Sequence, residues 1–185
     1  MIICICGKSG SGKSTLSNEL EKKYKDNLIH VDVDKIAHDV LLDSNVKRNL
    51  IRSFGDSILE NNIIDRKKLS KIVYNSKDKM NILSKITWNS MKLKIDEIIN
   101  NNKDKIIVLD YILIYKTEYF KNSDIKILLD VPYEIRKERC IIRDNISSDE
   151  FDLREKASIS FDENKFDYVI NDNNKAEIKR LVKLI

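Results

Sequence analysis

The sequence has few of the residues that interrupt or cross-link a chain. It contains one proline, four glycines and three cysteines among 185 residues. A composition so poor in proline and glycine excludes collagen-like and linker-rich proteins, and no segment marks a domain boundary. The three cysteines match neither a disulfide framework nor the spacing of a zinc site, which excludes a small cross-linked secreted domain.

Long apolar runs and an excess of one charge are also missing. No apolar stretch approaches the roughly 20 residues of a membrane-spanning helix, and no signal sequence precedes the first apolar run. The 34 basic and 30 acidic residues are interspersed and leave a net charge of +4, which argues against a nucleic-acid-binding surface. We therefore predict a cytoplasmic protein, a monomer or weak homo-oligomer, with no membrane or nucleic-acid partner.

Short apolar runs alternate with helical patterns along the chain. Fully apolar runs are typical of strands that are buried on both faces of a parallel sheet. Cys4 and Cys6 alternate within the first run, so they should share one face of a strand and pack in the core. The alternation predicts an α/β fold, a doubly wound parallel sheet of about five strands with right-handed crossovers. The predicted strands are 2–6, 28–31, 105–109, 124–131 and 168–170.

The helical segments carry recognisable start signals. Asp65 and Ser76 are placed as N-caps, Pro132 as a first helical residue, and Ser147 with Glu150 as a capping box. The helical stretch between the second and third strands is longer than a crossover requires. We therefore expect one domain, 1–185, with a helical substrate-binding subdomain at about 35–101. The predicted helices are 13–25, 35–42, 46–54, 66–74, 77–100, 132–143, one from 147, and 175–184.

The segment after the first strand is the most specific motif. It reads Gly7-Lys8-Ser9-Gly10-Ser11-Gly12-Lys13-Ser14 and fills every position of the phosphate-binding motif G-x-x-x-x-G-K-[ST]. The glycines let backbone N–H groups curl around phosphate oxygens, and the helix that follows adds partial positive charge. Lys13 is predicted to reach the β- and γ-phosphates and Ser14 to bind Mg²⁺, with Thr15 next in the helix. The motif thus predicts nucleoside-triphosphate binding.

Three carboxylates are predicted at the carboxyl ends of strands, where ligands bind in such sheets. Asp32 and Asp34 follow the second strand, and Asp110 ends the third. One of the first two would lie by the metal's water shell while the other accepts the proton of an acceptor hydroxyl, as a small-molecule kinase requires. Asp110 resembles a Walker B aspartate on the magnesium side. Alternatively, Asp34 is only the N-cap of a helix that begins at Lys35.

Three arginines are candidates for neutralising transition-state charge, because a guanidinium suits phosphate oxygens. Arg139 and Arg143 are four residues apart and so share a helical face, and Arg154 follows in the next helix. The alternative is that they are surface residues paired with carboxylates. We interpret His30 and His38 as structural residues.

The chain resembles the dephospho-coenzyme A kinase family over essentially its whole length. The segment 30–38, with Asp32, Asp34 and Ala37, is similar to the family's D-A-D-x-x-A-[RH]. The end of the chain is similar to the family's A-D-x-V-I-x-N. The other matching residues are Phe54-Gly55, Ile64-Asp65-Arg66, Leu69, Val131-Pro132, Arg139, Arg143 and Asp167-Tyr168-Val169-Ile170-Asn171.

This resemblance implies a P-loop kinase that uses ATP and Mg²⁺ to phosphorylate the ribose 3′-hydroxyl of dephospho-coenzyme A. It implies Asp34 as the base for that hydroxyl and Asn171 as a nucleotide-binding residue. It also implies that the helices of about 35–101 hold the acceptor and that Arg143 leads into a lid at about 143–163. The family's lid motif R-I-x-x-Q is not preserved, and its nearest counterparts in this chain are Arg154 and Lys156.

The chain departs from the family pattern at two acceptor-side segments. Trp88-Asn89 stands where the family has His-Pro, and 110–116 reads D-Y-I-L-I-Y-K instead of D-x-P-L-L-x-E. Two alternatives therefore stay open: another small-molecule or nucleoside kinase on the same fold, and a GTPase-like nucleotide switch. Asn164-Lys165-Phe166-Asp167 matches the guanine-reading N-K-x-D, but it precedes a predicted strand instead of following one.

Overall fold

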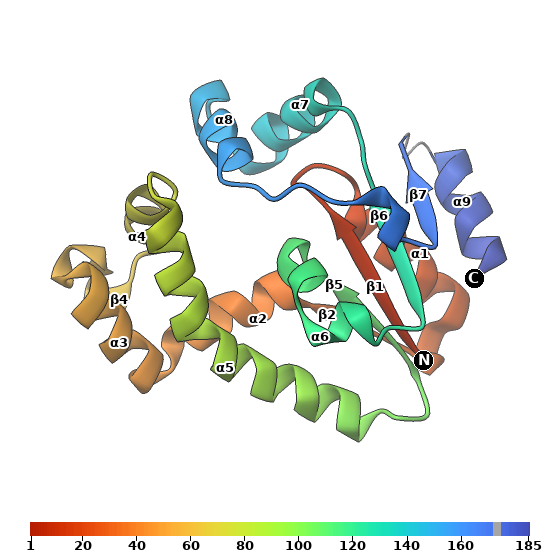
Figure 1. The fold of residues 1–185 in the computed structure, drawn as a ribbon, viewed down its shortest axis with the longest axis horizontal. Helices are drawn as coiled ribbons and strands as arrows, with labels where there is room; N and C mark the ends of the chain where they lie inside the picture. The colour runs from red at the N-terminus through yellow and green to blue at the C-terminus, as the bar shows by residue number, and fades with distance from the viewer. Residues whose placement is uncertain (172–174) are drawn as a thin grey trace. The chain divides into compact units, whose positions relative to one another are not determined.

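The structure, a computed structural model, describes residues 1–171 and 175–185 (Figure 1). The chain divides into two compact units. The first unit combines Met1–Asp32 with Ile99–Ile185, and the second is Val33–Ile98. The first unit contains the parallel sheet and the phosphate loop, whereas the second is mainly helical.

The sheet of the first unit has five strands, all parallel, in the order β2-β5-β1-β6-β7. This confirms the predicted α/β class and sheet. The chain passes from β1 to β2 and β5 on one side of β1 and then crosses to β6 and β7 on the other, so the carboxyl end of β1 lies where ligands bind in such folds. The strands are β1 (Ile2–Gly7), β2 (Leu28–Asp32), β5 (Ile106–Asp110), β6 (Ile125–Leu129) and β7 (Tyr168–Ile170).

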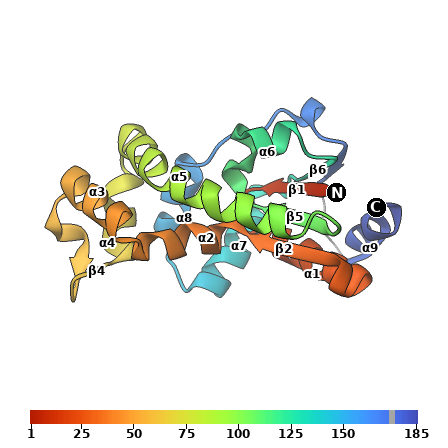
Figure 2. The same ribbon diagram turned by 90° about the horizontal axis from the view of Figure 1, so that it is seen from below.

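The two faces of β1 are covered by different helices. Ile3 and Ile5 lie in a core cluster with side chains of α1 (Lys13–Tyr24) and α9 (Lys175–Leu184). The opposite face meets the 3₁₀ helix Ile112–Lys116 and α6 (Glu118–Lys121), and Figure 2 shows α6 across the sheet from α1 and α9.

Cys4 and Cys6 belong to that second face, as predicted. Both are fully buried free thiols, and the Cys4 Sγ lies 3.7 Å from the carbonyl oxygen of Tyr119 in α6. Burial raises the pKa of Cys4 to about 11 and raises the pKa of Cys6 further. Their complete burial fits core packing, because a free cysteine behaves as a small apolar side chain.

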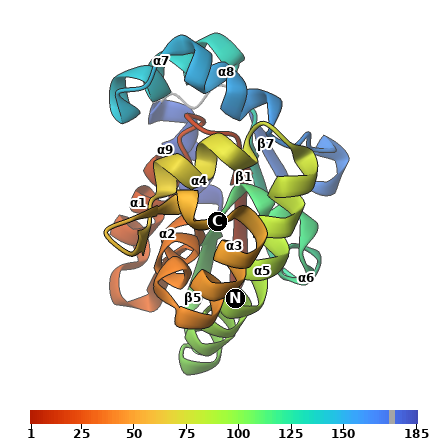
Figure 3. The ribbon, with the colours of Figure 1, turned by 90° about the vertical axis from the view of Figure 1, so that its left-hand side faces the viewer.

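Two helices lie beyond the carboxyl ends of the strands, α7 (Tyr133–Asp144) and α8 (Ser148–Lys156), as Figures 1 and 3 show. Pro132 is the N-cap of α7 and not its first helical residue, because its ψ of 145° is extended. The predicted capping box of α8 is confirmed: Glu150 N donates to Ser147 Oγ at 3.2 Å, and Ser147 N donates to Glu150 Oε2 at 3.1 Å.

The second unit packs its helices around their own apolar core. Asp65 caps α4 as predicted, because its Oδ1 accepts from Lys68 N at 2.8 Å. The hairpin of β3 (Leu59–Glu60) and β4 (Ile63–Ile64) was not predicted. The core residues are Val46, Leu50, Ile58, Ile64, Leu69 and Val73. The helices are α2 (Val33–Asp39), α3 (Ser44–Phe54), α4 (Arg66–Val73) and α5 (Lys77–Asn101), the last ending in the first unit.

Replacing Gly10 by alanine should destabilise the protein more than replacing Gly55. Both glycines have positive φ, +80° and +79°. A Cβ on Gly10 would lie 2.5 Å from the carbonyl oxygen of Arg136, whereas one on Gly55 would meet nothing within 4 Å. The backbone conformation alone costs an alanine roughly 1–3 kcal/mol. We expect about that loss for Gly55→Ala and a larger loss for Gly10→Ala in urea unfolding. Equal losses would contradict the close approach of α7 to the loop.

Candidate active site

The phosphate loop connects β1 to α1 in a conformation that depends on glycine. Gly12 is the N-cap of α1 in the left-handed region, with φ 94° and ψ 19°. Ser11 N donates to the Lys8 carbonyl at 3.1 Å, which closes a turn inside the loop. The first turn of α1 contains no acidic residue. No carboxylate of this turn therefore neutralises the positive end of the helix dipole, which favours the binding of an anion there.

The residues predicted to contact phosphate and metal begin α1. Lys13 and Ser14 are its first two residues, and Thr15 is the third. Lys13 is half-buried, whereas Ser14 and Thr15 are exposed. The hydroxyl groups are accessible beside the amino end of the helix, as the motif requires of a nucleotide site.

Asp32 and Asp110 end neighbouring strands at the same edge of the sheet. They are directly opposite each other in the register of β2 and β5, and Asp110 is also opposite Ile5 of β1. Asp32 is exposed, but Asp110 is only 4% exposed. The structure therefore brings together two carboxylates that are far apart in the sequence.

Asp110 has a contact that the sequence did not predict. Its Oδ2 lies 3.6 Å from His30 Nε2, and His30 Nδ1 lies 3.7 Å from Glu21 Oε1. Burial acts to lower the pKa of His30, but Asp110 and Glu21 outweigh it and hold that pKa above its ordinary value. The other oxygen of Asp110, Oδ1, accepts no hydrogen bond within the described residues.

The predicted arginines lie on α7 and α8. Arg143 Nε contacts Asp144 Oδ1 at 2.7 Å, and Arg154 NH1 contacts Asp144 Oδ2 at 3.1 Å. The hydrogen bond from Arg143 and the nearby Arg154 lower the pKa of Asp144. Arg139 instead reaches the phosphate loop, where its NH1 donates to the Gly10 carbonyl at 3.4 Å. The structure thus joins Arg143 and Arg154 through a carboxylate that the motifs did not single out.

A second ionic network links α8 directly to the phosphate loop. Glu155 Oε1 accepts from Lys8 Nζ at 2.7 Å and from Arg136 NH2 at 3.0 Å, and Glu155 Oε2 accepts from Arg136 NH1 at 2.9 Å. Burial would raise the pKa of Glu155, but Arg136 and Lys8 outweigh it and lower that pKa. Neither Arg136 nor Glu155 was predicted from the sequence.

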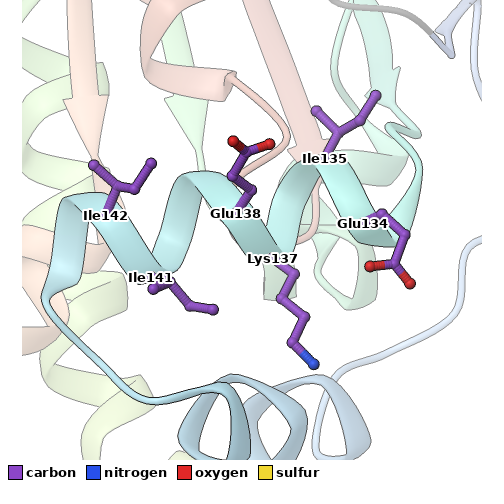
Figure 4. A pocket seen from close by; sticks show the side chains of 6 residues that line it. All are labelled: Glu134, Ile135, Lys137, Glu138, Ile141 and Ile142. Atoms are coloured by element: carbon purple, nitrogen blue, oxygen red, sulfur yellow. The ribbon is translucent and has the colours of Figure 1, made fainter.

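A surface depression along α7 is lined by side chains of that helix only (Figure 4). Lys137 extends from it toward α8, where its Nζ lies 2.9 Å from Asp152 Oδ1. No residue of the phosphate loop lines this depression, so it is not part of the nucleotide site. Its lining residues are Glu134, Ile135, Lys137, Glu138, Ile141 and Ile142.

The remaining candidates lie elsewhere. Asp34 is an exposed residue in the first turn of α2, which begins at Val33. The interpretation of Asp34 as the N-cap of a helix starting at Lys35 is therefore wrong. Asn171 is exposed directly after β7. In the two described ranges, no group of three His, Cys, Asp or Glu residues is placed to hold a metal, and no helix has the length and hydropathy to span a membrane.

Comparison with known proteins identifies the family. The model of the family described as dephospho-CoA kinase matches residues 1–178. The chain belongs to the dephospho-CoA kinase family. It is 35% identical over 181 residues to the dephospho-CoA kinase of Fusobacterium nucleatum, covering 96% of this chain and 92% of that protein. It is 32% identical to that of Aquifex aeolicus, covering 95% and 90%.

A solved structure supports the same assignment. The dephospho-CoA kinase from Campylobacter jejuni matches with a TM-score of 0.57 and 26% identity, covering 99% of this chain and 94% of that one. The family predicted from the motifs is thus confirmed, and with it a kinase with the family's dephospho-CoA kinase activity. The chain belongs to the family despite its altered segments at Trp88-Asn89 and 110–116. Because the family is one of kinases, the alternative of a GTPase-like switch is not supported.

The contribution of Glu155 to stability should disappear in acid. Its lowered folded-state pKa means that the charged form favours folding, so the stabilisation is present above the ordinary carboxyl pKa of about 4.3. It is lost as the pH falls through the lowered value. Glu155→Gln should reduce the free energy of unfolding by about 1–3 kcal/mol at pH 7. Urea unfolding at a series of pH values should show this difference shrinking only below about pH 4. A difference that stays constant down to pH 3 would disprove the ionic role.

Proposed function

We propose that the enzyme transfers the γ-phosphoryl group of ATP to the ribose 3′-hydroxyl of dephospho-coenzyme A. The hydroxyl oxygen forms a bond to the γ-phosphorus, the bond from that phosphorus to the β–γ bridging oxygen breaks, and coenzyme A and ADP are the products. The observation that carries the proposal is the glycine-shaped phosphate loop ahead of α1, whose first turn has no acidic residue. The family match over residues 1–178 supports the choice of acceptor.

The loop residues are proposed to bind the triphosphate. Backbone N–H groups along 7–15 would donate to phosphate oxygens, and Lys13 would neutralise charge between the β- and γ-phosphates. Asn171, exposed at the end of β7, is proposed to contribute on the nucleotide side. Because phosphoryl transfer needs little covalent help from a protein, positioning and charge neutralisation by these groups provide most of the catalysis.

Ser14, Asp32 and Asp110 are the proposed magnesium residues, and their chemistry fits the ion. A hydroxyl and two carboxylates are the hard oxygen ligands that Mg²⁺ prefers, and it usually takes few protein ligands beside phosphates and water. The buried Oδ1 of Asp110 has no hydrogen-bond donor in the described residues, which suits the ion or one of its waters. When bound, Mg²⁺ neutralises charge on the transferred phosphoryl group.

Asp34 is the proposed general base. Its carboxylate would accept the proton of the 3′-hydroxyl as the oxygen attacks, and it would orient that hydroxyl in line with the γ-phosphate. Its exposure at the start of α2, two residues beyond Asp32, supports a role toward a substrate. Helices of about 35–101 are proposed to hold the acceptor.

The segment of about 143–163 is proposed to be a lid that closes over the phosphates and excludes water. Arg143 and Arg154 would exchange their shared partner Asp144 for phosphate oxygens, since a guanidinium binds both kinds of oxygen. We also propose that the enzyme is cytoplasmic and is a monomer or a weak homo-oligomer.

Asp34→Asn should lower kcat by about 10²-fold or more and leave the KM for ATP nearly unchanged, because it removes a base that acts in the transition state. Asp39→Asn is the matched control, as Asp39 is another exposed carboxylate of α2. Steady-state assays with ATP, Mg²⁺ and dephospho-coenzyme A measure both constants. If Asp34→Asn turns over as fast as Asp39→Asn, the base must be sought at Asp32 or Asp110.

The product of the wild-type reaction tests the acceptor itself. Mass spectrometry and phosphate-position analysis should identify coenzyme A with the new phosphate on the 3′-oxygen. Nucleoside monophosphates and shikimate-like alcohols should remain largely unmodified. Phosphorylation of one of these alcohols in place of dephospho-coenzyme A would reject the proposed acceptor.

Lys13→Ala should abolish measurable turnover, because it removes the charge aimed at the β- and γ-phosphates. Lys22→Ala is the matched control: Lys22 lies on the same helix, α1, and forms an exposed ion pair with Glu19. Circular dichroism and thermal unfolding check that both variants are folded. Turnover of a folded Lys13→Ala protein at the rate of Lys22→Ala would refute the role of Lys13.

A further inference from the structure

Arg136 is a buried arginine with hydrogen bonds on all three guanidinium nitrogens. It is 4% exposed, and its Nε donates to the carbonyl of Val131 at 2.8 Å. Its NH1 and NH2 form a bidentate pair with Glu155, and NH1 also lies 3.4 Å from the carbonyl oxygen of Ser9. A buried guanidinium is costly unless an anion compensates it, and Glu155 supplies that anion.

The contact with Ser9 fixes the orientation of a peptide group inside the phosphate loop. In a planar trans peptide the C=O and the following N–H point in opposite directions. When the Ser9 carbonyl accepts from Arg136, the N–H of Gly10 is turned away from α7. Arg139 NH1 makes the same contact with the Gly10 carbonyl at 3.4 Å, and the N–H at the other end of that peptide, on Ser11, donates to the Lys8 carbonyl at 3.1 Å. The N–H of Gly10 is thus a loop donor whose direction is set from α7.

The loop and α7 are also in direct backbone contact. A Cβ on Gly10 would lie 2.5 Å from the Arg136 carbonyl oxygen and 3.0 Å from the Arg136 Cα. The backbone of α7 thus lies too close to Gly10 for any side chain at that position of the loop. Glu155 closes the network from α8, since the same carboxylate that holds Arg136 accepts from Lys8 at the start of the loop.

We propose that Arg136 is a positioning residue for the phosphate loop and that Glu155 holds it in place. The pair aligns the Ser9–Gly10 peptide so that the N–H group of Gly10 meets the phosphates of ATP. The inference rests on the proposed binding of ATP by the loop. It assigns the nucleotide affinity of this enzyme partly to two residues that lie outside the phosphate-binding motif.

Two substitutions that conserve the net charge of the network test this positioning role. Arg136→Lys keeps the charge and loses the planar fork, and Glu155→Asp keeps the charge and loses the reach to two partners. Each should raise the Kd for ATP by about tenfold, with the KM for dephospho-coenzyme A within about twofold of wild type. Arg180→Lys, an exposed arginine on α9, is the matched control and should bind ATP as wild type does.

Calorimetric titration with ATP needs no acceptor, so it separates this inference from the proposed function. If the wild-type protein binds ATP but does not phosphorylate dephospho-coenzyme A, the proposed acceptor is wrong. The ATP affinities of the variants and the wild type can still be compared in that case. Variants that bind ATP as tightly as Arg180→Lys would overturn the positioning role. Equal rises in both substrate constants would also overturn it, since they would indicate a general loss of structure.

If Arg136→Lys does not fold, Glu155→Asp still decides the question through hydrogen exchange. The amide of Ser11, which donates to the carbonyl of the Lys8 residue that Glu155 holds, should exchange faster than in wild type, with exchange in the β1 core unchanged. Unchanged exchange at this amide together with unchanged ATP affinity would reject the proposal.

Discussion

The position of β1 is the constraint on which the nucleotide site depends. Its apolar residues are buried on both faces, and the register places Ile5 beside Asp110 of β5 and Gly7 beside Leu129 of β6. A slip of one residue would exchange the two faces of the strand, so that Ile3 and Ile5 would no longer meet the side chains of α1 and α9. Since the phosphate loop begins where β1 ends, the packing of this one strand sets where the loop, the carboxylates and α7 meet.

The elements that sequence reasoning located well are those with strong local patterns. The strand Tyr168–Ile170 and the helix Lys175–Leu184 have the predicted limits, and the capping box at Ser147 forms as expected. The hairpin at 59–64 was missed because each of its strands has two residues, too few to show an alternating pattern. It turns through Asn61 and Asn62, both with positive φ, a conformation that asparagine tolerates better than most residues.

The candidate site likewise has one part that the sequence predicted and one part that it did not. Its phosphate loop was recognisable because the whole motif is contiguous in sequence. The contacts around it were not: Arg136 lies 127 positions from Ser9, and Glu155 lies 147 positions from Lys8. These contacts depend on the packing of α7 and α8 against the phosphate loop. The spacing of residues along a short stretch of sequence does not reveal that packing. Arg143 and Arg154 were selected for their residue type, but only the folded chain shows that they share one carboxylate.

The burial of the cysteines has a consequence for the redox chemistry of this enzyme. All three thiols are free and buried, and burial raises each pKa. The thiolate is the form that peroxides and alkylating reagents attack, so its population is very small at every native cysteine. The central strand of the sheet therefore resists oxidation while folded, and a cysteine introduced on the surface would react far faster with a maleimide than any of the native ones.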